Sequence, residues 1–333
     1  MTAAHRRSLH ELAADASSAL LLGCGGGGDV IQGLPIARYL QALGVDRVVL
    51  AGLGGKWWGD TGLRFGCEVL DLAWLTDTEE VGPHARLVSP LTTVSEGRGR
   101  GRAPHESVLA RECGLPVAML DLRAGLPGLR GGLGSLAERF EVDLVIVVDI
   151  GADSFYTGTE TTVMSPLLDA MSMAAAVSLD PDAVFALTGY GCDTELPISM
   201  LHRNVGLAMS RGGFLGAHGL TQADAAELEG ILDNFPQSDI ERRPYRAARG
   251  ELGVTPIKRF FSTEVLPLAA IYMLFALDVL VGEVNPLPAA IADTGTLAAA
   301  EQVVLDAGLF PETRMPGMIE APTPPQVPDG GEG

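Results

Sequence analysis

Acidic residues follow glycine-punctuated apolar runs at several places in the sequence. Asp149 ends the run DLVIVVDIG, and Asp153 and Glu160 follow in the loop GADSFYTGTETT. Asp193 and Glu195 follow a second apolar run, in TGYGCDTELP. Grouped carboxylates can hold Mg²⁺, orient ribose or sugar hydroxyls, or raise one another's pKa for acid–base catalysis. The residue types alone leave these three kinds of chemistry open.

A glycine-rich loop, GCGGGGDV at residues 23–30, is the other place with chemical potential. Its pattern G-x-G-x-x-G lies between a strand and a helix, which is typical of a backbone cradle for an anionic group. The following acid would bind hydroxyls or a divalent ion, or would simply cap the helix. No acid ends the second strand, which disfavours NAD, and no Lys-Ser/Thr follows the loop, which excludes a Walker A motif. The predicted ligand contacts here are Gly25, Gly26, Gly27, Gly28 and Asp29.

Short strands and helices alternate along the chain and would position these acids. We expect an α/β fold with a doubly wound, mostly parallel sheet and helices on both faces, a Rossmann-like three-layer arrangement. Strand carboxyl ends share one edge in such a sheet, so Asp29, Asp149 and Asp193 are predicted to lie close together. Strands are predicted within SSALLLGCGG and DRVVLAGLGG and at 116–122, 143–151 and 183–189; helices are predicted at 31–44, 105–113, 133–140, 163–178 and 195–211.

The rest of the chain is predicted in less detail. After the second strand, GGKWWGDTG and SEGRGRGRAPHE (95–106) resemble long loops. After residue 213, Thr221 caps a helix, TPIKRFF resembles a strand, and a last helix ends at Gly308. We expect an N-terminal segment at 1–16, one large domain at 17–310, either undivided or with a C-terminal subdomain from about 213, and a flexible tail at 311–333.

Other side chains are weaker candidates. His218, among small residues in GGFLGAHGLT, would shuttle a proton, or would bond only to backbone in a loop. Cys24, inside the glycine loop, is a nucleophile or a small buried side chain. The tryptophans of KWWGD (56–60) would stack on a ring or anchor a loop, and the GRGRGR run (97–102) would form a lid or be disordered.

Composition excludes several classes of partner. The chain carries 42 acidic and 23 basic residues and a net charge of −19, so we expect no nucleic-acid partner. Scattered cysteines and a polar N-terminal stretch favour the cytoplasm. The apolar run 265–277 is too short to span a membrane, for which about 20 residues are needed, and is expected in the core. We expect a homo-oligomer that binds a small-molecule ligand.

Several motifs together resemble one prokaryotic family, the one catalogued as domain of unknown function 1152. The glycine loop with Asp29, the stretch 148–175, GYGCDTELP, RGGFLGAHGLT and GEVNPL occur in the order and spacing typical of that family. The resemblance covers most of residues 17–310 and implies a Rossmann-like three-layer domain, without an activity. Ala152 stands where the family pattern resembles glycine.

We therefore predict a cytoplasmic enzyme that binds a nucleotide, a nucleoside or a sugar phosphate and catalyses group transfer or hydrolysis, in a biosynthetic pathway. A non-catalytic nucleotide sensor and an NAD(P)-dependent oxidoreductase are the alternatives. As a structural alternative, Asp149 caps a turn, and Thr159 and Glu160 begin a helix. The cofactor is open, with Mg²⁺ (on Asp149 and Asp153) or a nucleotide as options. The predicted catalytic residues are Asp149, Asp153, Glu160 and His218, and the predicted ligand contacts outside the glycine loop are Thr159, Asp193 and Glu195.

Overall fold

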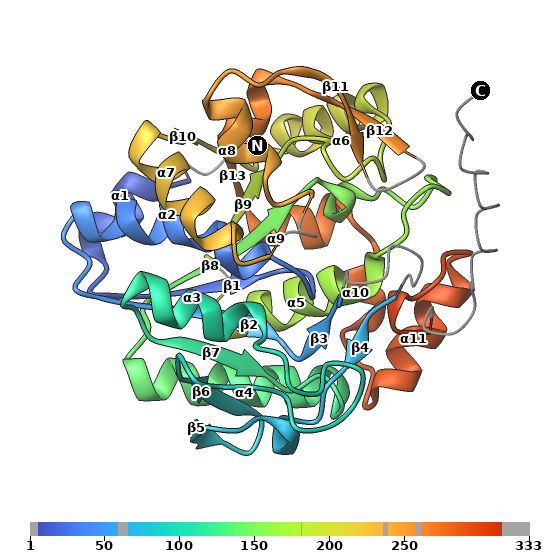
Figure 1. Ribbon diagram of the computed structural model, residues 1–333. Coiled ribbons are helices and arrows are strands. Elements are labelled where there is room, and N and C mark those ends of the chain that lie inside the picture. Colours follow the sequence, from blue (N-terminus) through green and yellow to red (C-terminus); the bar gives the residue numbers. More distant parts are fainter. Residues whose placement is uncertain (1–5, 59–65, 181, 236–238, 258–260, 315–333) are drawn as a thin grey trace, which may run out of the picture.

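The structure is a computed structural model that describes residues 6–58, 66–180, 182–235, 239–257 and 261–314. It contains a nine-stranded sheet whose five inner strands run parallel and whose outer pairs are antiparallel. Figure 1 shows the sheet running from β10 near the top of the view to β5 at the bottom. The order is β10 (Phe214–Gly219), β13 (Ile271–Ala276), β9 (Val184–Thr188), β8 (Leu144–Ile150), β1 (Ser18–Gly23), β2 (Arg47–Leu53), β7 (Val117–Leu120), β6 (Ala85–Val88) and β5 (Thr78–Gly82).

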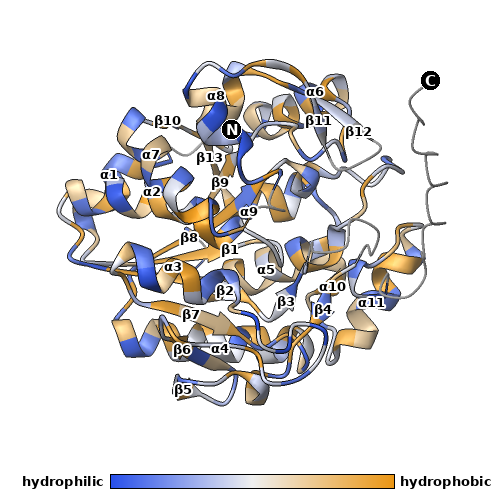
Figure 2. Ribbon diagram, viewed as in Figure 1, coloured by the Kyte–Doolittle hydropathy of each residue, from blue (hydrophilic) through white to orange (hydrophobic). Residues whose placement is uncertain are grey.

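Helices cover both faces of the sheet, which is why the inner strands are apolar on both sides. In β1, Leu20 and Leu22 join the core on one face, and Ala19 and Leu21 join the core on the other. Figure 2 shows apolar residues concentrated in the central strands. The first face carries α4 (Gly125–Phe140), α5 (Pro166–Leu179), α6 (Ile198–Ser210), α10 (Leu287–Ile291) and α11 (Leu297–Asp306); the second carries α1 (Leu9–Asp15), α2 (Asp29–Ala42), α3 (His105–Cys113) and α7 (Gln222–Leu232).

Shorter elements complete the described chain. Two small antiparallel pairs lie outside the main sheet, and short helical turns lie between the larger elements. The pairs are β3 (Gly55–Lys56) with β4 (Glu68–Val69) and β11 (Gly253–Ile257) with β12 (Phe261–Val265). The turns are η1 (Leu72–Trp74), η2 (Asp153–Phe155), α8 (Arg243–Ala248), η3 (Pro267–Ala270), α9 (Leu277–Val279), η4 (Leu280–Val284) and η5 (Glu312–Arg314).

The α/β fold is confirmed, and so are most of the predicted elements. Thr221 caps α7 through a reciprocal pair of hydrogen bonds with Asp224, and Gly308 follows α11 in a left-handed conformation. The helix predicted at 133–140 begins earlier, at Gly125, because packing against the sheet outweighs the helix-breaking effect of its glycines. The region between β2 and α3 contains four strands that were not predicted, β3 to β6, and β3 lies within the predicted loop GGKWWGDTG.

The C-terminal region contributes to the main sheet and also forms a separate pair of strands. β10 and β13 come from beyond residue 213 and extend the main sheet next to β9, whereas β11 pairs only with β12. The apolar run 265–277 contains β13, most of which is buried. The predicted tail begins too early, because Glu312 is buried against α5; residues 315–333 lie outside the described residues. Within the described ranges, no helix is both long and apolar enough to span a membrane.

Candidate functional site

The strand order reverses between β1 and β8, and the candidate site lies at this point. The chain leaves β1 through α2 to reach β2 on one side, and it leaves β8 through α5 to reach β9 on the other. In an open parallel sheet, the loops that leave two such strands diverge, and a crevice forms outside their carboxyl ends. The glycine loop follows β1 here, and the loop that carries Asp153 follows β8, which contains Asp149.

Asp29 ties these two loops together. It is the first residue of α2, and its Oδ1 accepts a hydrogen bond from the Ile150 backbone N–H at 3.1 Å, across the boundary between β1 and β8. A Cβ atom on Gly25 would lie 2.9 Å from Asp29 Oδ2 and 3.3 Å from Asp169 Oδ1. The loop therefore lacks a side chain at residue 25 because two carboxylates of the same chain approach its backbone.

Asp149, Asp153 and Asp169 form the centre of the site, and we call them the carboxylate triad. One oxygen from each lies within 4.8 Å of the others, and each residue is at most 5% exposed. Within the described part of the chain, no basic side chain forms an ion pair with the triad or with Asp29. These three carboxyl groups can hold a cation or share protons.

Burial and mutual repulsion disfavour the ionised forms of these acids. Burial, followed by the charge of Asp29, raises the pKa of Asp149 well above its usual range, although a hydrogen bond from the Ser154 hydroxyl opposes the rise. Burial and then the neighbouring triad members do the same for the pKa of Asp153 and of Asp169. Two like charges about 4 Å apart repel by about 4 kcal/mol at an effective dielectric constant of about 20. The three carboxyl groups are therefore not all ionised at the same time unless a cation is bound.

A hydrogen bond between Asp153 and Asp169 partly offsets the rise in the pKa of Asp169. A carboxyl group and a carboxylate that share a proton in this way are suited to acid–base catalysis. The Ser165 hydroxyl lies 3.1 Å from Asp153 Oδ2 and 2.8 Å from Glu195 Oε1, which links the pair to the next acidic loop.

Asp193 and Glu195 lie beside the triad, as predicted. A Cβ atom on Gly151 would lie 2.4 Å from Asp193 Oδ2, so glycine at this position lets the two loops touch. Glu195 accepts hydrogen bonds from the backbone N–H groups of Met164 and Ser165, just before α5 begins. The charges of Asp193 and Glu195 both contribute to the raised pKa of Asp149 and of Asp153.

The backbone at Gly151 and Ala152 is turned into a conformation that favours glycine. The φ angles are 122° and 116°, and Ala152 has no exposed surface. An alanine with positive φ costs of the order of 1–3 kcal/mol, and such strain is concentrated at functional sites. The turn carries Asp153 back toward Asp149, which explains why glycine suits residue 152.

The glycine loop does not match the predicted anion cradle. The Gly28 N–H donates to Glu241 Oε1 at 3.2 Å, and a Cβ atom on Gly28 would lie 2.3 Å from Glu241 Cγ. A Cβ atom on Gly26 would lie 2.6 Å from the Gly55 carbonyl oxygen. The glycines therefore admit other parts of the same chain, and a carboxylate already accepts one of the loop's N–H groups. Burial, and then the charge of Glu241, raise the pKa of Asp29 to about 7.

Glu160 and Thr159 are placed differently from the prediction. Glu160 accepts hydrogen bonds from the Thr157 backbone and hydroxyl, and from Asn204 Nδ2 at 2.7 Å. Burial would raise its pKa, but these hydrogen bonds outweigh burial and lower it. Glu160 thus stabilises its own loop, Thr159 is exposed, and no helix begins there because α5 starts at Pro166.

His218 does not join the carboxylates. It lies in the antiparallel strand β10 rather than in a loop, and its ring packs on Tyr39 with the centroids 4.2 Å apart. Tyr39 is ten residues beyond Asp29 in α2, roughly 15 Å along the axis at about 1.5 Å per residue. Burial lowers the pKa of His218. The position gives no support to His218 as the proton shuttle.

The remaining candidates are structural in this arrangement. Cys24 is fully buried, and burial and then the charge of Asp169 raise the pKa of its thiol, so it is no activated nucleophile. Trp58 donates to Glu68 Oε2 at 2.5 Å and packs on the backbone of Gly99, so it anchors a loop. The 97–102 run is an ordered turn held by that same glutamate.

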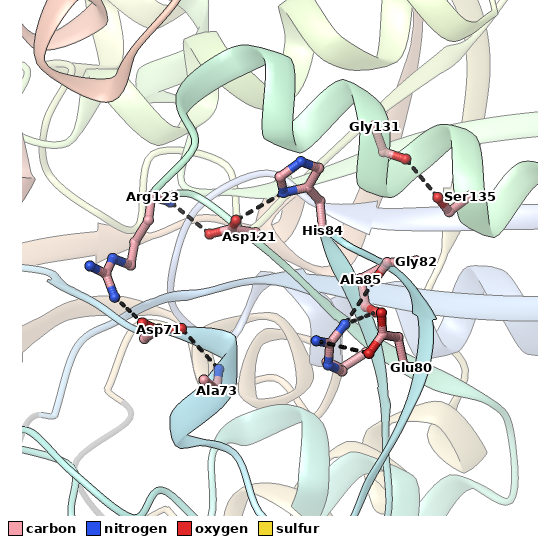
Figure 3. Close-up of polar contacts among 11 residues, drawn as sticks. Asp71, Ala73, Glu80, Gly82, His84, Ala85, Asp121, Arg123, Gly131 and Ser135 are labelled. Atoms are coloured by element: carbon pink, nitrogen blue, oxygen red, sulfur yellow. Dashed lines mark hydrogen bonds and ion pairs between the residues drawn. The ribbon is translucent and has the colours of Figure 1, made fainter.

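Asp121 follows β7 at the same edge but belongs to a separate network. Figure 3 shows its carboxylate between His84 Nδ1, at 3.0 Å, and the Arg123 backbone N–H, at 2.8 Å. The Arg123 side chain also pairs with Asp71. An acid at a strand end is therefore not enough to place a residue in the site.

Two acids beside the triad loops, Asp169 and Glu312, were not predicted from the sequence. Asp169 is a lone charge in the apolar helix PLLDAMSMAAAVSL, a signal that would have found it. Glu312 accepts hydrogen bonds from the Leu167 and Leu168 N–H groups at the start of α5, and burial raises its pKa to about 7. It comes from a distant part of the sequence, and no local signal marks it.

Comparisons with known proteins identify a family and no activity. No curated protein and no solved structure matches the chain significantly. The sequence profile of a family described as "Protein of unknown function (DUF1152)" matches residues 20–316, which include every member of the carboxylate triad. The chain therefore belongs to the DUF1152 family.

Proposed function

We propose that this protein is an enzyme that binds a divalent cation at the carboxylate triad and acts on an anionic, hydroxyl-rich small molecule. A nucleotide, a nucleoside or a sugar phosphate fits this description, and the reaction class is group transfer or hydrolysis. The observation that carries the proposal is the buried triad, without an ion-pair partner among the described residues, at the point where the strand order reverses.

The chemistry of the triad favours a hard cation. Mg²⁺ and Mn²⁺ prefer carboxylate oxygens, and a bound cation would offset the repulsion that otherwise keeps the triad protonated. Such a cation would also neutralise the negative charge of a phosphate-bearing substrate, which the acidic surroundings would otherwise repel. Asp193 and Glu195 would then bind hydroxyls of the ligand, and the Asp153–Asp169 pair would exchange a proton with it.

Metal binding is the first test. Thermal unfolding of the chelator-treated protein is followed with Mg²⁺, Mn²⁺ and Ca²⁺ at millimolar concentration. A cation at 100 times its Kd should stabilise the wild type by about 2.7 kcal/mol. Asp149→Asn and Asp169→Asn should remove that response and leave the metal-free protein equally stable or more stable, because a neutral amide escapes the cost of a buried charge. Asp121→Asn, at the same edge but outside the triad, should keep the response.

The ligand class and turnover are tested in the same format. Nucleotides, sugar phosphates, NAD and coenzyme A are added with and without Mg²⁺, and the ligands that stabilise are then assayed for product. Binding followed by product supports the enzyme, whereas binding without product indicates a nucleotide sensor. If none of the three cations stabilises the wild type, the metal-dependent proposal is wrong.

A further inference from the structure

A buried ion pair lies beside the site, and the proposed reaction does not use it. Lys56 Nζ is 2.5 Å from Glu106 Oε1, and the two side chains are 1% and 0% exposed. Lys56 follows β2 in the short strand β3, and Glu106 is in the first turn of α3. Lys56 is one of only two lysines in the chain.

This ion pair is incompletely hydrogen-bonded. Glu106 Oε2 is buried and has no hydrogen-bond partner in the described part of the chain. Lys56 Nζ, which carries three donors, reaches only Glu106 Oε1 among the same residues. A buried ion pair is costly unless its other donors and acceptors are also satisfied. Glu106 Oε2 and the remaining N–H groups of Lys56 lie side by side, so together they suit a ligand group that both donates and accepts a hydrogen bond.

The position of the pair connects it to the glycine loop. A Cβ atom on Gly52 would lie 1.9 Å from Glu106 Oε1, so the carboxylate rests on the backbone of β2 near its carboxyl end. β2 neighbours β1, and the Gly55 carbonyl beside Lys56 touches Gly26. The charge of Lys56 also lowers the pKa of Asp29 somewhat. The pair is thus one strand away from the strand that leads to Asp29.

No acid ends the second strand in the sequence, but the structure supplies one there from α3. In dinucleotide-binding sheets of the Rossmann type, a carboxylate at the end of the second strand accepts a hydrogen bond from a ribose hydroxyl. Trp57 offers an apolar surface close by, with its Cδ1 3.8 Å from the position a Cβ would take on Gly27. The surroundings therefore suit a sugar ring.

We propose that Lys56 and Glu106 form a hydroxyl-binding subsite for the sugar of the ligand. One hydroxyl would donate to Glu106 Oε2 and accept from Lys56 Nζ, with the phosphate-bearing end directed toward the carboxylate triad. This inference rests on the proposed function, because it assumes a phosphorylated, hydroxyl-rich ligand.

Calorimetric titration tests the subsite with four probes in the presence of Mg²⁺. The probes are AMP, 2′-deoxy-AMP, ribose 5-phosphate and 2-deoxyribose 5-phosphate, so a free sugar phosphate and a nucleotide are compared. The wild type should bind at least one hydroxylated probe about tenfold more tightly than its deoxy partner, since a site built for a hydroxyl is left unpaired without it. The probe pair that shows this preference identifies the source of the sugar.

The decisive variant is Lys56→Met/Glu106→Leu, which replaces both partners with apolar residues. Such double replacements usually keep or increase stability, whereas Lys56→Met alone would leave a buried charge. The double variant should fold, respond to Mg²⁺ as the wild type does, and bind the hydroxylated and deoxy probes within about twofold.

Three results would overturn the subsite. In the first, the double variant would still prefer the hydroxylated probes. In the second, the wild type would bind both members of each probe pair equally. Either result leaves the triad and the proposed function standing. In the third, the wild type would respond to Mg²⁺ but bind none of the four probes. That result would refute both the proposed ligand class and the subsite.

Discussion

Replacement of Asp29 by asparagine should stabilise the metal-free protein at high pH. Burial and Glu241 raise the pKa of Asp29 from 3.8 to about 7. Between these values the native state binds a proton that the unfolded state has lost, so the free energy of unfolding falls by about 1.4 kcal/mol per pH unit. The stabilisation that comes from this native-state proton is fully present below about pH 4 and is lost once the pH has passed about 7. Over this window the loss amounts to about 4 kcal/mol.

Asparagine does not titrate, so Asp29→Asn avoids this loss. It still offers an oxygen to the Ile150 N–H, and at pH 4 the native carboxyl is protonated, so both side chains are neutral acceptors there. The variant should therefore be about as stable as the wild type at pH 4 and about 4 kcal/mol more stable at pH 8, because the pKa of about 7 already includes the hydrogen bond to the ionised carboxylate.

Urea unfolding at pH 4, 6 and 8 in the presence of chelator measures how the stability difference grows with pH. Asp143→Asn is a matched control at the other end of β1, where the carboxylate accepts hydrogen bonds from the Ser17 and Ser18 N–H groups. It should gain no stability at pH 8. A difference between Asp29→Asn and the wild type that is the same at pH 4 and pH 8 would refute the electrostatic account of this site.

Three further predictions concern the loops around the triad. Ser154→Ala removes the hydroxyl that lowers the pKa of Asp149, so the pH midpoint of Mn²⁺ binding should move upward by about one unit, as measured by titration calorimetry across pH. Ala152→Gly should raise the free energy of unfolding by about 1 kcal/mol, because relief of backbone strain exceeds the loss of about 0.8 kcal/mol from one buried methyl group; a lower urea midpoint would contradict this. Glu312→Ala should lower the melting temperature, with a loss of about 2 kcal/mol, because two N–H groups at the start of α5 lose their acceptor; Glu301→Ala, at a partly exposed ion pair with Arg314, should cost less than about 1 kcal/mol.

The outline of the site follows from local patterns in the sequence. The carboxyl ends of parallel strands share an edge, so Asp149 near the end of β8 lies close to Asp29 and Asp193, which follow β1 and β9. Apolar runs bounded by glycine reveal those strands because their residues are buried on both faces. Asp169 was not predicted, although a lone charge in an apolar helix marks a buried polar position; this pattern does not identify the partner of the charge.

The parts that could not be predicted depend on contacts distant in sequence. Glu241 reaches the glycine loop from 213 residues away, and Glu312 reaches α5 from 145 residues away. His218 was misplaced because the glycines around it resemble a loop, whereas they lie in an edge strand that tolerates them. The acid at the end of β2 could likewise not be predicted from the second strand, because Glu106 reaches that position from α3.

Glycines in the loops of the site leave the space that the buried acidic side chains occupy. Gly25 makes room for Asp29 and Asp169, Gly28 for Glu241, and Gly151 for Asp193. Without a cation the arrangement opposes folding, since it concentrates like charges in a region with little water. Only the large apolar core around the parallel strands offsets such a cost, and a sequence selected for stability alone would replace these acids. Their presence together at the switch point therefore supports the proposal of a bound cation.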